Sequence, residues 1–177
     1  MATFSIDQLR SLPDYAQVTK WNINFVTLPG VGALAFPVSD ELNFRAESVT
    51  LPKATNQKFE VNTRGHKTWH PGIIDYGNSF DIVFTETVDN AIFNFVKAWR
   101  ELIWSSRQGS SFSKAELEAT ILITMLDNAD VERAKYTLFG CFLEDYDFGT
   151  LDGATSDAIK PTMTLSFDFF VDLPLNA

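Results

Sequence analysis

The sequence predicts a mainly β, α+β fold: two packed antiparallel β-sheets in a sandwich or barrel, with one flanking α-helix and a long β-hairpin. Apolar and polar residues alternate with a period of two along much of the chain, and one central segment changes to helical spacing. A length of 177 residues suits one domain, so residues 1–177 are expected to form a single unit. Hydrophobic residues make up 45% and charged residues 21%, which is ordinary for a globular protein.

Seven segments show the alternation that is typical of strands. The first places three apolar side chains on one face, Trp21, Ile23 and Phe25, and ends before a Pro-Gly pair. The others are expected at 43–51, 57–63, 79–86, 119–126, 136–143 and 162–171. In the last strand, five apolar residues face one way: Met163, Leu165, Phe167, Phe169 and Val171. These segments predict seven or eight strands.

One helix is expected at about 89–108. Its apolar residues are spaced by three and four and form one stripe: Ile92, Phe95, Val96, Trp99, Leu102 and Ile103. Asp89 suits the N-cap, and Gly109 suits the position after the C-terminus. Phe93 and Trp104 lie off the stripe, and at about 100° per residue they point the same way. They belong either to a broad stripe over a wide sheet or to an aromatic pair that contacts a neighbouring subunit.

The net charge of −9 and the pI near 4.6 argue against nucleic-acid binding. The sequence has no long cluster of Lys or Arg, and an acidic protein repels a phosphate backbone. It shows neither a signal peptide nor an apolar run of about 18 residues, so we expect assembly in the cytoplasm. The single cysteine, Cys141, precludes an intrachain disulfide and is expected to be a buried hydrophobic residue.

The sequence carries no pattern of catalytic or metal-binding chemistry. His66 and His70 are four residues apart in a strand-and-turn context, and without a helix we expect them not to share a face. There is no phosphate-binding loop, dinucleotide fingerprint or nucleophile elbow. An acidic run at the end of a predicted strand suits a solvated surface: Glu144, Asp145 and Asp147. We expect no enzyme activity, no cofactor and no bound metal.

The segment 43–69 predicts a long two-stranded hairpin. Its charged residues alternate in sign: Arg45, Glu47, Lys58, Glu60, Arg64 and Lys67. A lone hairpin is marginally stable in water, and unpaired sheet edges attract other strands. With Phe44, Phe59 and Trp69 added, this hairpin is suited to dock on another copy of the chain.

The order and spacing of these motifs resemble the tail tube proteins of contractile-tailed bacteriophages. The similar segments are the hairpin strands 44–52 and 59–65, the turn 70–72, the strand 80–84, the helix 89–104 and the final strand 163–171. The resemblance covers residues 18–173. Two differences are the sequence His70-Pro71-Gly72-Ile73, which replaces a commoner turn, and a distinctive stretch before residue 18.

The resemblance implies a fold shared with the tube of type VI secretion systems, and hexameric rings stacked into a hollow tube inside a contractile sheath. The implied partners are further copies of the chain, the tail sheath protein, baseplate and tail terminator proteins, and double-stranded DNA that passes through the lumen without specific binding. The implied location is the phage tail of a virion. Four strands per subunit give a ring of 24, and strands about 4.8 Å apart with a tilt of about 40° leave a lumen of roughly 38 Å.

The hairpin and the helix supply the expected subunit interface: Phe44, Arg45, Glu47, Phe59, Glu60, Arg64, Trp69, Phe93 and Trp104. An acidic wall would keep DNA from binding, so the expected lumen residues are carboxylates: Glu47, Glu60, Asp81, Glu86, Asp168 and Asp172. The two differences leave an alternative, a baseplate protein of the same fold on which the tube is initiated. A tube subunit of a phage-tail-like secretion or injection system is a further alternative.

Overall fold

The computed structural model describes residues 6, 10, 16–29, 39–154 and 157–174. The strands in these residues are β1 (Trp21–Thr27), β2 (Ala46–Val49), β3 (Ala54–Thr63), β4 (His66–Tyr76), β5 (Ser79–Phe84), β6 (Ala119–Leu126), β7 (Glu132–Asp147), β8 (Thr162–Ser166) and β9 (Phe169–Pro174). The helices are α2 (Ser39–Arg45), α3 (Ala91–Ile103) and α4 (Lys114–Leu117). None of these helices is long and apolar enough to cross a bilayer.

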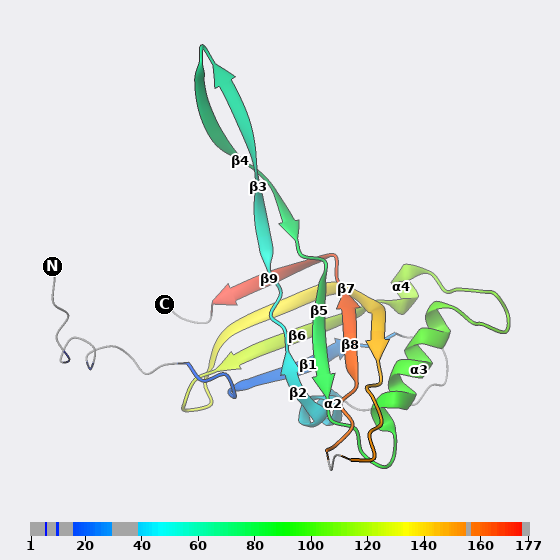
Figure 1. The fold of residues 1–177 in the computed structure, drawn as a ribbon. Helices are drawn as coiled ribbons and strands as arrows, with labels where there is room; N and C mark the ends of the chain where they lie inside the picture. The colour runs from blue at the N-terminus through cyan, green and yellow to red at the C-terminus, as the bar shows by residue number, and fades with distance from the viewer. Residues whose placement is uncertain (1–5, 7–9, 11–15, 30–38, 155–156, 175–177) are drawn as a thin grey trace.

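One antiparallel sheet, in the order β1-β6-β7-β8-β5-β2 with β9 also on β7, forms the body of the molecule. The long strand β7 belongs to two layers, because its first half pairs with β6 and β9 and its second half pairs with β8. The sheet therefore folds over along β7 into one layer of β1, β6, β7 and β9 and another of β7, β8, β5 and β2 (Figure 1). This architecture confirms the predicted mainly β fold of packed antiparallel sheets.

The core lies between the two layers and under α3. Both layers contribute side chains that are fully buried: Ile23, Ile121, Ile123, Ile82, Phe84, Met163 and Leu165. From α3, Phe95 and Trp99 join the same cluster, and the Trp99 indole donates a hydrogen bond of 3.2 Å to the carbonyl of Leu117. Cys141 is buried here as expected, and burial raises the pKa of its thiol to about 12.

The predicted hairpin is displaced along the sequence. Instead of spanning 43–69, it is formed by β3 and β4, and it projects from the body (Figure 1). Its turn is Arg64-Gly65, whose φ angles of 49° and 82° suit a two-residue hairpin turn. The segment 43–51 alternates in sequence, but only its residues Ala46–Val49 form a strand. This strand is β2, which belongs to the main sheet.

The first part of that segment is the helix α2, which covers the outer edge of β1. Leu42 is fully buried and anchors the helix. The backbone N–H of Ile23 donates to the Asn43 side chain (2.8 Å), and the N–H of Phe25 donates to the Ser39 hydroxyl (2.9 Å). Tertiary contacts of this kind override the alternation at 43–51, which is why the sequence prediction of a strand from residue 43 is wrong.

The predicted strand 162–171 is two strands with a bend at Phe167-Asp168. β8 pairs with β5 and the second half of β7, whereas β9 pairs with the first half of β7. The bend inverts the faces, so Phe169 is 43% exposed while Phe170 packs on Tyr76 with ring centroids 5.4 Å apart. Beside the bend, Gly140 on β7 has a φ of 66° and the Asp168 carboxylate lies against it.

Helix α3 is shorter than the predicted 89–108, because Trp104 leaves it with an extended φ of −151°. The N-cap position is Asn90 rather than Asp89, and Asp89 accepts a hydrogen bond from the backbone N–H of Ala91 while Glu86 accepts those of the next two residues. Glu86 is only 8% exposed, and its carboxylate accepts hydrogen bonds from the backbone N–H of Phe93 (2.8 Å) and of Ile92 (3.3 Å).

The carboxylate of Asp127 organises the turn between β6 and β7. It accepts hydrogen bonds from the backbone N–H of Val131 (2.9 Å) and Ala129 (2.8 Å) and pairs with the Arg133 guanidinium (2.6 Å). These contacts, with the Val131 hydrogen bond first among them, lower the pKa of Asp127 below its usual 3.8.

Asp127→Asn is therefore expected to lower the melting temperature at pH 7 and to have little effect at about pH 2. Because the folded-state pKa is depressed, the contribution of this carboxylate is complete above about pH 4 and is lost as the pH falls through the folded-state value. Thermal unfolding at several pH values checks this, with Asp152→Asn in an exposed loop as the control. If Asp127→Asn lowers the melting temperature by the same amount at every pH, the Asp127 carboxylate does not stabilise the fold through its charge.

Candidate assembly interface

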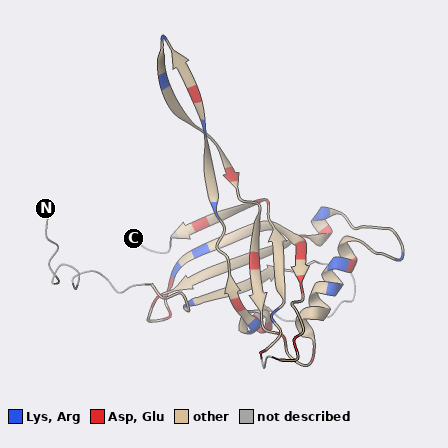
Figure 2. Ribbon diagram, in the orientation of Figure 1, with Lys and Arg blue, Asp and Glu red and all other residues tan. Residues whose placement is uncertain are grey.

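The outer face of the β2, β5, β8 and β7 layer gathers carboxylates from three strands. Asp81 on β5 and Asp145 on β7 both pair with Thr164, from opposite sides, so they share a face. Asp147 lies two residues further along β7 and therefore on the same side. With two more side chains, this surface comprises Glu47, Asp81, Glu144, Asp145 and Asp147, and we call it the acidic face. Figure 2 shows acidic positions along the ribbon of this layer.

Hydroxyl groups on the same face hold these carboxylates in place. Thr164 donates to Asp81 at 2.6 Å, and Ser166 donates to Glu144 at 2.5 Å. Glu47 forms the one ion pair of the acidic face in the described residues, with the Lys160 ammonium at 2.6 Å. The face is thus polar and strongly negative, with one ion-paired cation among the described residues.

Two strands leave an edge of this layer unpaired within the described residues. β2 is the last strand of the sheet and pairs only with β5. At the other side of the layer, the second half of β7, residues 142–147, pairs only with β8. Unpaired edges present rows of backbone donors and acceptors, and such rows are templates for strands of another chain.

The hairpin carries aromatic residues on both of its faces. On one face Phe59 stacks on His70, with ring centroids 5.5 Å apart. On the other face Trp69 lies under the Lys58 ammonium at 4.6 Å. Phe59 and Trp69 are each about half exposed, at 53% and 54%. An element with two exposed aromatic faces is suited to lie between other protein surfaces.

The predicted interface residues fall into separate places. Phe59, Glu60, Arg64 and Trp69 are on the hairpin, whereas Phe44 and Arg45 are on α2 and Glu47 is on β2. Arg45 is engaged within the chain, where its guanidinium pairs with Glu41 (2.7 Å) and Asp89 (2.9 Å), so its assignment to a hairpin interface is wrong. Phe44 remains 86% exposed on α2.

Of the two interpretations of Phe93 and Trp104, the aromatic pair toward a neighbouring subunit does not fit Phe93. Phe93 packs inside the chain on Phe148, with ring centroids 4.5 Å apart. Trp104 is 55% exposed, and because the helix has already ended at Ile103, helical periodicity does not set its direction.

Two of the six predicted lumen carboxylates share the acidic face: Glu47 and Asp81. Glu60 lies on the hairpin and pairs with Lys67 at 2.7 Å, and Asp172 lies on β9 in the other layer. Asp168 is at the bend and pairs with Lys114 at 2.5 Å. Glu86 is buried at the start of α3, so it cannot line a lumen. The acidic run at 144–147, expected only to be solvated, supplies the other three members of the face.

The described residues contain no group of three or more side chains that could hold a metal ion. His66 and His70 do share a face, contrary to the sequence prediction, because residues an even number apart in a strand point the same way. Four residues of strand separate them by about 13 Å, which is too far for one metal ion.

No family model matches the sequence, and no curated protein matches it as a relative. Among solved structures, a chain of the anti-feeding prophage cap, described as a tube terminating cap, has a TM-score of 0.65 and 12% identity, over 93% of this chain and 95% of that chain. A chain of the sheath–tube complex of the PVC extracellular contractile injection system has a TM-score of 0.61 and 13% identity, over 98% and 100%. A chain of the PVC sheath/tube terminator gives 0.63 and 12%, over 92% and 99%. The protein shares the fold of these chains.

Proposed function

We propose that this protein is a structural subunit of the tail tube of a contractile phage and is not an enzyme. The observation that carries the proposal is the layer of β2, β5, β8 and β7. It has one acidic face, and in the described residues the outer edge of the strand at each side is unpaired. Copies that join β2 to the second half of β7 in the next copy extend this layer from subunit to subunit.

The strand directions support this joint. Every pair in the layer is antiparallel, so β7 and β5 run one way and β8 and β2 run the other. A neighbouring β7 placed beside β2 continues the same alternation. The two edges belong to different surfaces of one subunit, so the contact is head-to-tail, and head-to-tail contacts close into rings when the rotation allows.

Six copies with four strands each close a barrel of 24 strands, the number implied by the resemblance. At strand spacings of about 4.8 Å and a tilt of about 40°, the lumen is roughly 38 Å across. A DNA duplex is roughly 20 Å across, so it passes with room for ions. With the acidic face turned inward, the wall repels the phosphates and the duplex moves without binding.

The proposed partners are the tail sheath protein around the tube and the baseplate and tail terminator proteins at its ends. The proposed location is the virion, after assembly in the host bacterial cytoplasm.

A second candidate is a tube subunit of an extracellular injection system, favoured by the likeness of fold to chains of such particles. A third is a baseplate initiator, since a chain of the anti-feeding prophage baseplate also shares the fold, at a TM-score of 0.61. DNA retained inside isolated particles distinguishes the first from the second, and self-assembly without a partner distinguishes both from the third.

Reversing charges on the acidic face tests the inward orientation. The double variant Asp81→Lys with Glu144→Lys is expected to assemble into tubes that retain short duplex DNA at about 50 mM salt and release it as salt rises, because phosphate contacts are salt-dependent. Asp172→Lys with Glu132→Lys makes the same change in net charge on the other layer and is expected to leave DNA retention unchanged. Equal retention by the two variants, measured by cosedimentation, would contradict an acidic lumen.

A further inference from the structure

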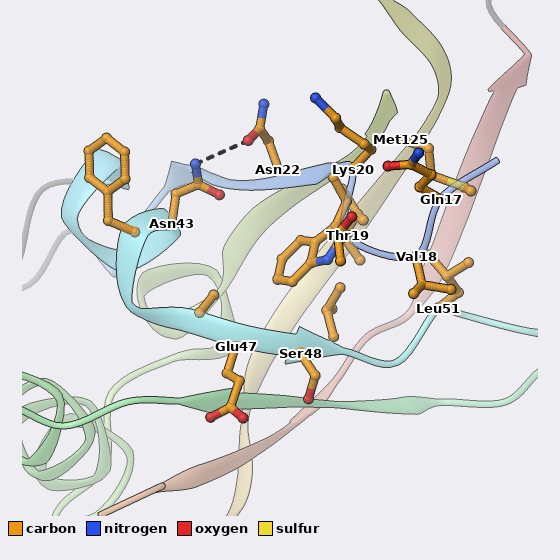
Figure 3. Close-up of a pocket in the computed structure, with 15 residues that line it drawn as sticks. Gln17, Val18, Thr19, Lys20, Asn22, Asn43, Glu47, Ser48, Leu51 and Met125 are labelled. Atoms are coloured by element: carbon orange, nitrogen blue, oxygen red, sulfur yellow. Dashed lines mark hydrogen bonds between the residues drawn. The ribbon is translucent and has the colours of Figure 1, made fainter. Parts of the chain in front are cut away.

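A groove lies between the edges of β1 and β2, where the folded sheet does not close on itself (Figure 3). Its volume is about 820 Å³. Trp21, Val49, Ile123 and Met125 supply its apolar walls. Glu47 and Ser48, on the same strand as Val49, also line the groove, and their side chains extend to the other side of β2 (Figure 3).

The groove is closed at one end and open at the other. At the closed end, α2 covers β1, and the Asn43 side chain donates to Asn22 at 3.3 Å. At the open end, the apolar residues of the rim are uncovered: Val18 is 92% exposed and Leu51 is 42% exposed. Exposed apolar side chains around an apolar hollow indicate a surface that another segment covers.

The residues before the groove have the sequence of a short amphipathic helix. Ser5 and Gln8 are spaced as a capping box, and Phe4 and Leu9 are spaced as the hydrophobic staple that accompanies one. Pro13 stops a helix at the residue before it. Ile6, Leu9 and Leu12 follow at intervals of three and form one apolar face. Ile6 is helical in the structure and 66% exposed, so its side chain has no cover.

Size and reach match this segment to the groove. A helix of residues 6–12 is about 10 Å long and about 10 Å wide, which amounts to roughly 800 Å³. So short a helix is not stable alone in water and needs a surface for its apolar face. The chain enters the open end directly, since Gln17, Val18, Thr19 and Lys20 line the groove. Residues 13–16 between helix and groove span at most about 14 Å.

We propose that residues 4–12 dock as a helix in the β1/β2 groove of their own chain, with Ile6, Leu9 and Leu12 turned toward Trp21 and Val49. The short connection gives the segment a high effective concentration at its own groove, which favours this groove over that of another copy. The docked segment covers the apolar hollow beside β2 and completes the open side of the sandwich.

Disulfide trapping in the full-length protein tests the proposal. Leu9→Cys combined with Leu51→Cys is expected to cross-link within one chain, at least tenfold faster than the control Asp7→Cys with Leu51→Cys, because Asp7 lies on the opposite side of the helix from Leu9. The buried Cys141 stays in place as an unreactive thiol. Equal rates for the two pairs would overturn docking, and cross-links only between chains would overturn docking on the same chain.

Hydrogen exchange gives a second, independent measurement. Leu9→Asp is expected to speed amide exchange at 17–22 and 46–49 at least tenfold, because it removes the cover of the groove. Asp7→Asn, on the polar side of the segment, is the matched control and is expected to leave that exchange unchanged. Exchange in Leu9→Asp that equals the unaltered protein would show that the segment does not cover the groove.

Discussion

Replacing residues 55–75 by a two-residue turn is expected to abolish the proposed assembly into rings and tubes while the body stays folded. Residues 55–75 contribute no side chain to the core, Tyr76 at the base of the hairpin is kept, and β3 and β4 pair only with each other in the described residues. Its loss therefore leaves the main sheet and α3 intact. It removes the exposed aromatic surfaces that we propose to lie between copies, and buried aromatic residues supply much of the binding energy of interfaces.

Sedimentation and circular dichroism separate these effects. The shortened protein is expected to unfold within a few degrees of the original and to sediment as a monomer at every concentration. Phe59→Ser with Trp69→Ser, one change on each face of the hairpin, is expected to weaken assembly by at least tenfold. The control Gln57→Ser with Asn62→Ser changes polar residues of β3 and should assemble normally. Tubes formed by the shortened protein would exclude the hairpin from the assembly contacts.

Gly140→Ala is expected to destabilise the fold at the point where β7 passes the bend between β8 and β9. The φ of 66° at residue 140 places it in the left-handed region, which costs a residue with a Cβ roughly 1–2 kcal/mol. A Cβ there would also lie 2.8 Å from the Asp168 Cγ. The overlapping atoms belong to the Asp168 carboxylate, whose side chain is half exposed and can rotate, so relief of the overlap adds only roughly 0.5–1.5 kcal/mol. The sum is about 2.5 kcal/mol, or a fall in melting temperature of roughly 5–10 °C for a chain of this length.

Gly109→Ala is the matched control for the backbone cost. Its φ of 62° is nearly the same, but a Cβ at residue 109 meets nothing within 4 Å. We expect a loss of about 1 kcal/mol there. Adding Asp168→Ala to Gly140→Ala should recover part of the loss, because the overlapping carboxylate is removed. If Gly140→Ala and Gly109→Ala unfold at the same temperature, the contact between residue 140 and Asp168 does not contribute to the loss of stability.

Local periodicity was enough to place most of the strands and α3. The alternation at 119–126 coincides with β6, and the stripe from Ile92 to Leu102 is the buried side of α3. Periodicity failed where tertiary contacts decide the conformation. Asn43 and Ser39 satisfy backbone groups of β1 from a helix, and no pattern within 39–51 carries that information. The bend at Asp168 is likewise set by pairing with the two halves of β7.

The candidate site was harder to predict than the fold. Alternation divides a strand into two faces without saying which is buried, so Glu47 and Asp81 could be proposed for the lumen but not ranked above Asp172. The register shift between Leu143 and Asp145 allows Glu144 and Asp145 to lie on one face, which strict alternation forbids. Glu86 was proposed for the lumen as a carboxylate of the predicted strand 79–86, but the free backbone N–H groups of α3 hold it in the interior.

Cryo-electron microscopy of the concentrated, purified protein shows whether copies join through the free edges of β2 and β7. We expect closed rings in which β2 of each copy pairs antiparallel with residues 142–147 of the next, with Asp81 and Glu144 on the inner wall. A monomer that leaves both strand edges in solvent, or a ring that carries these carboxylates on its outer surface, would contradict it.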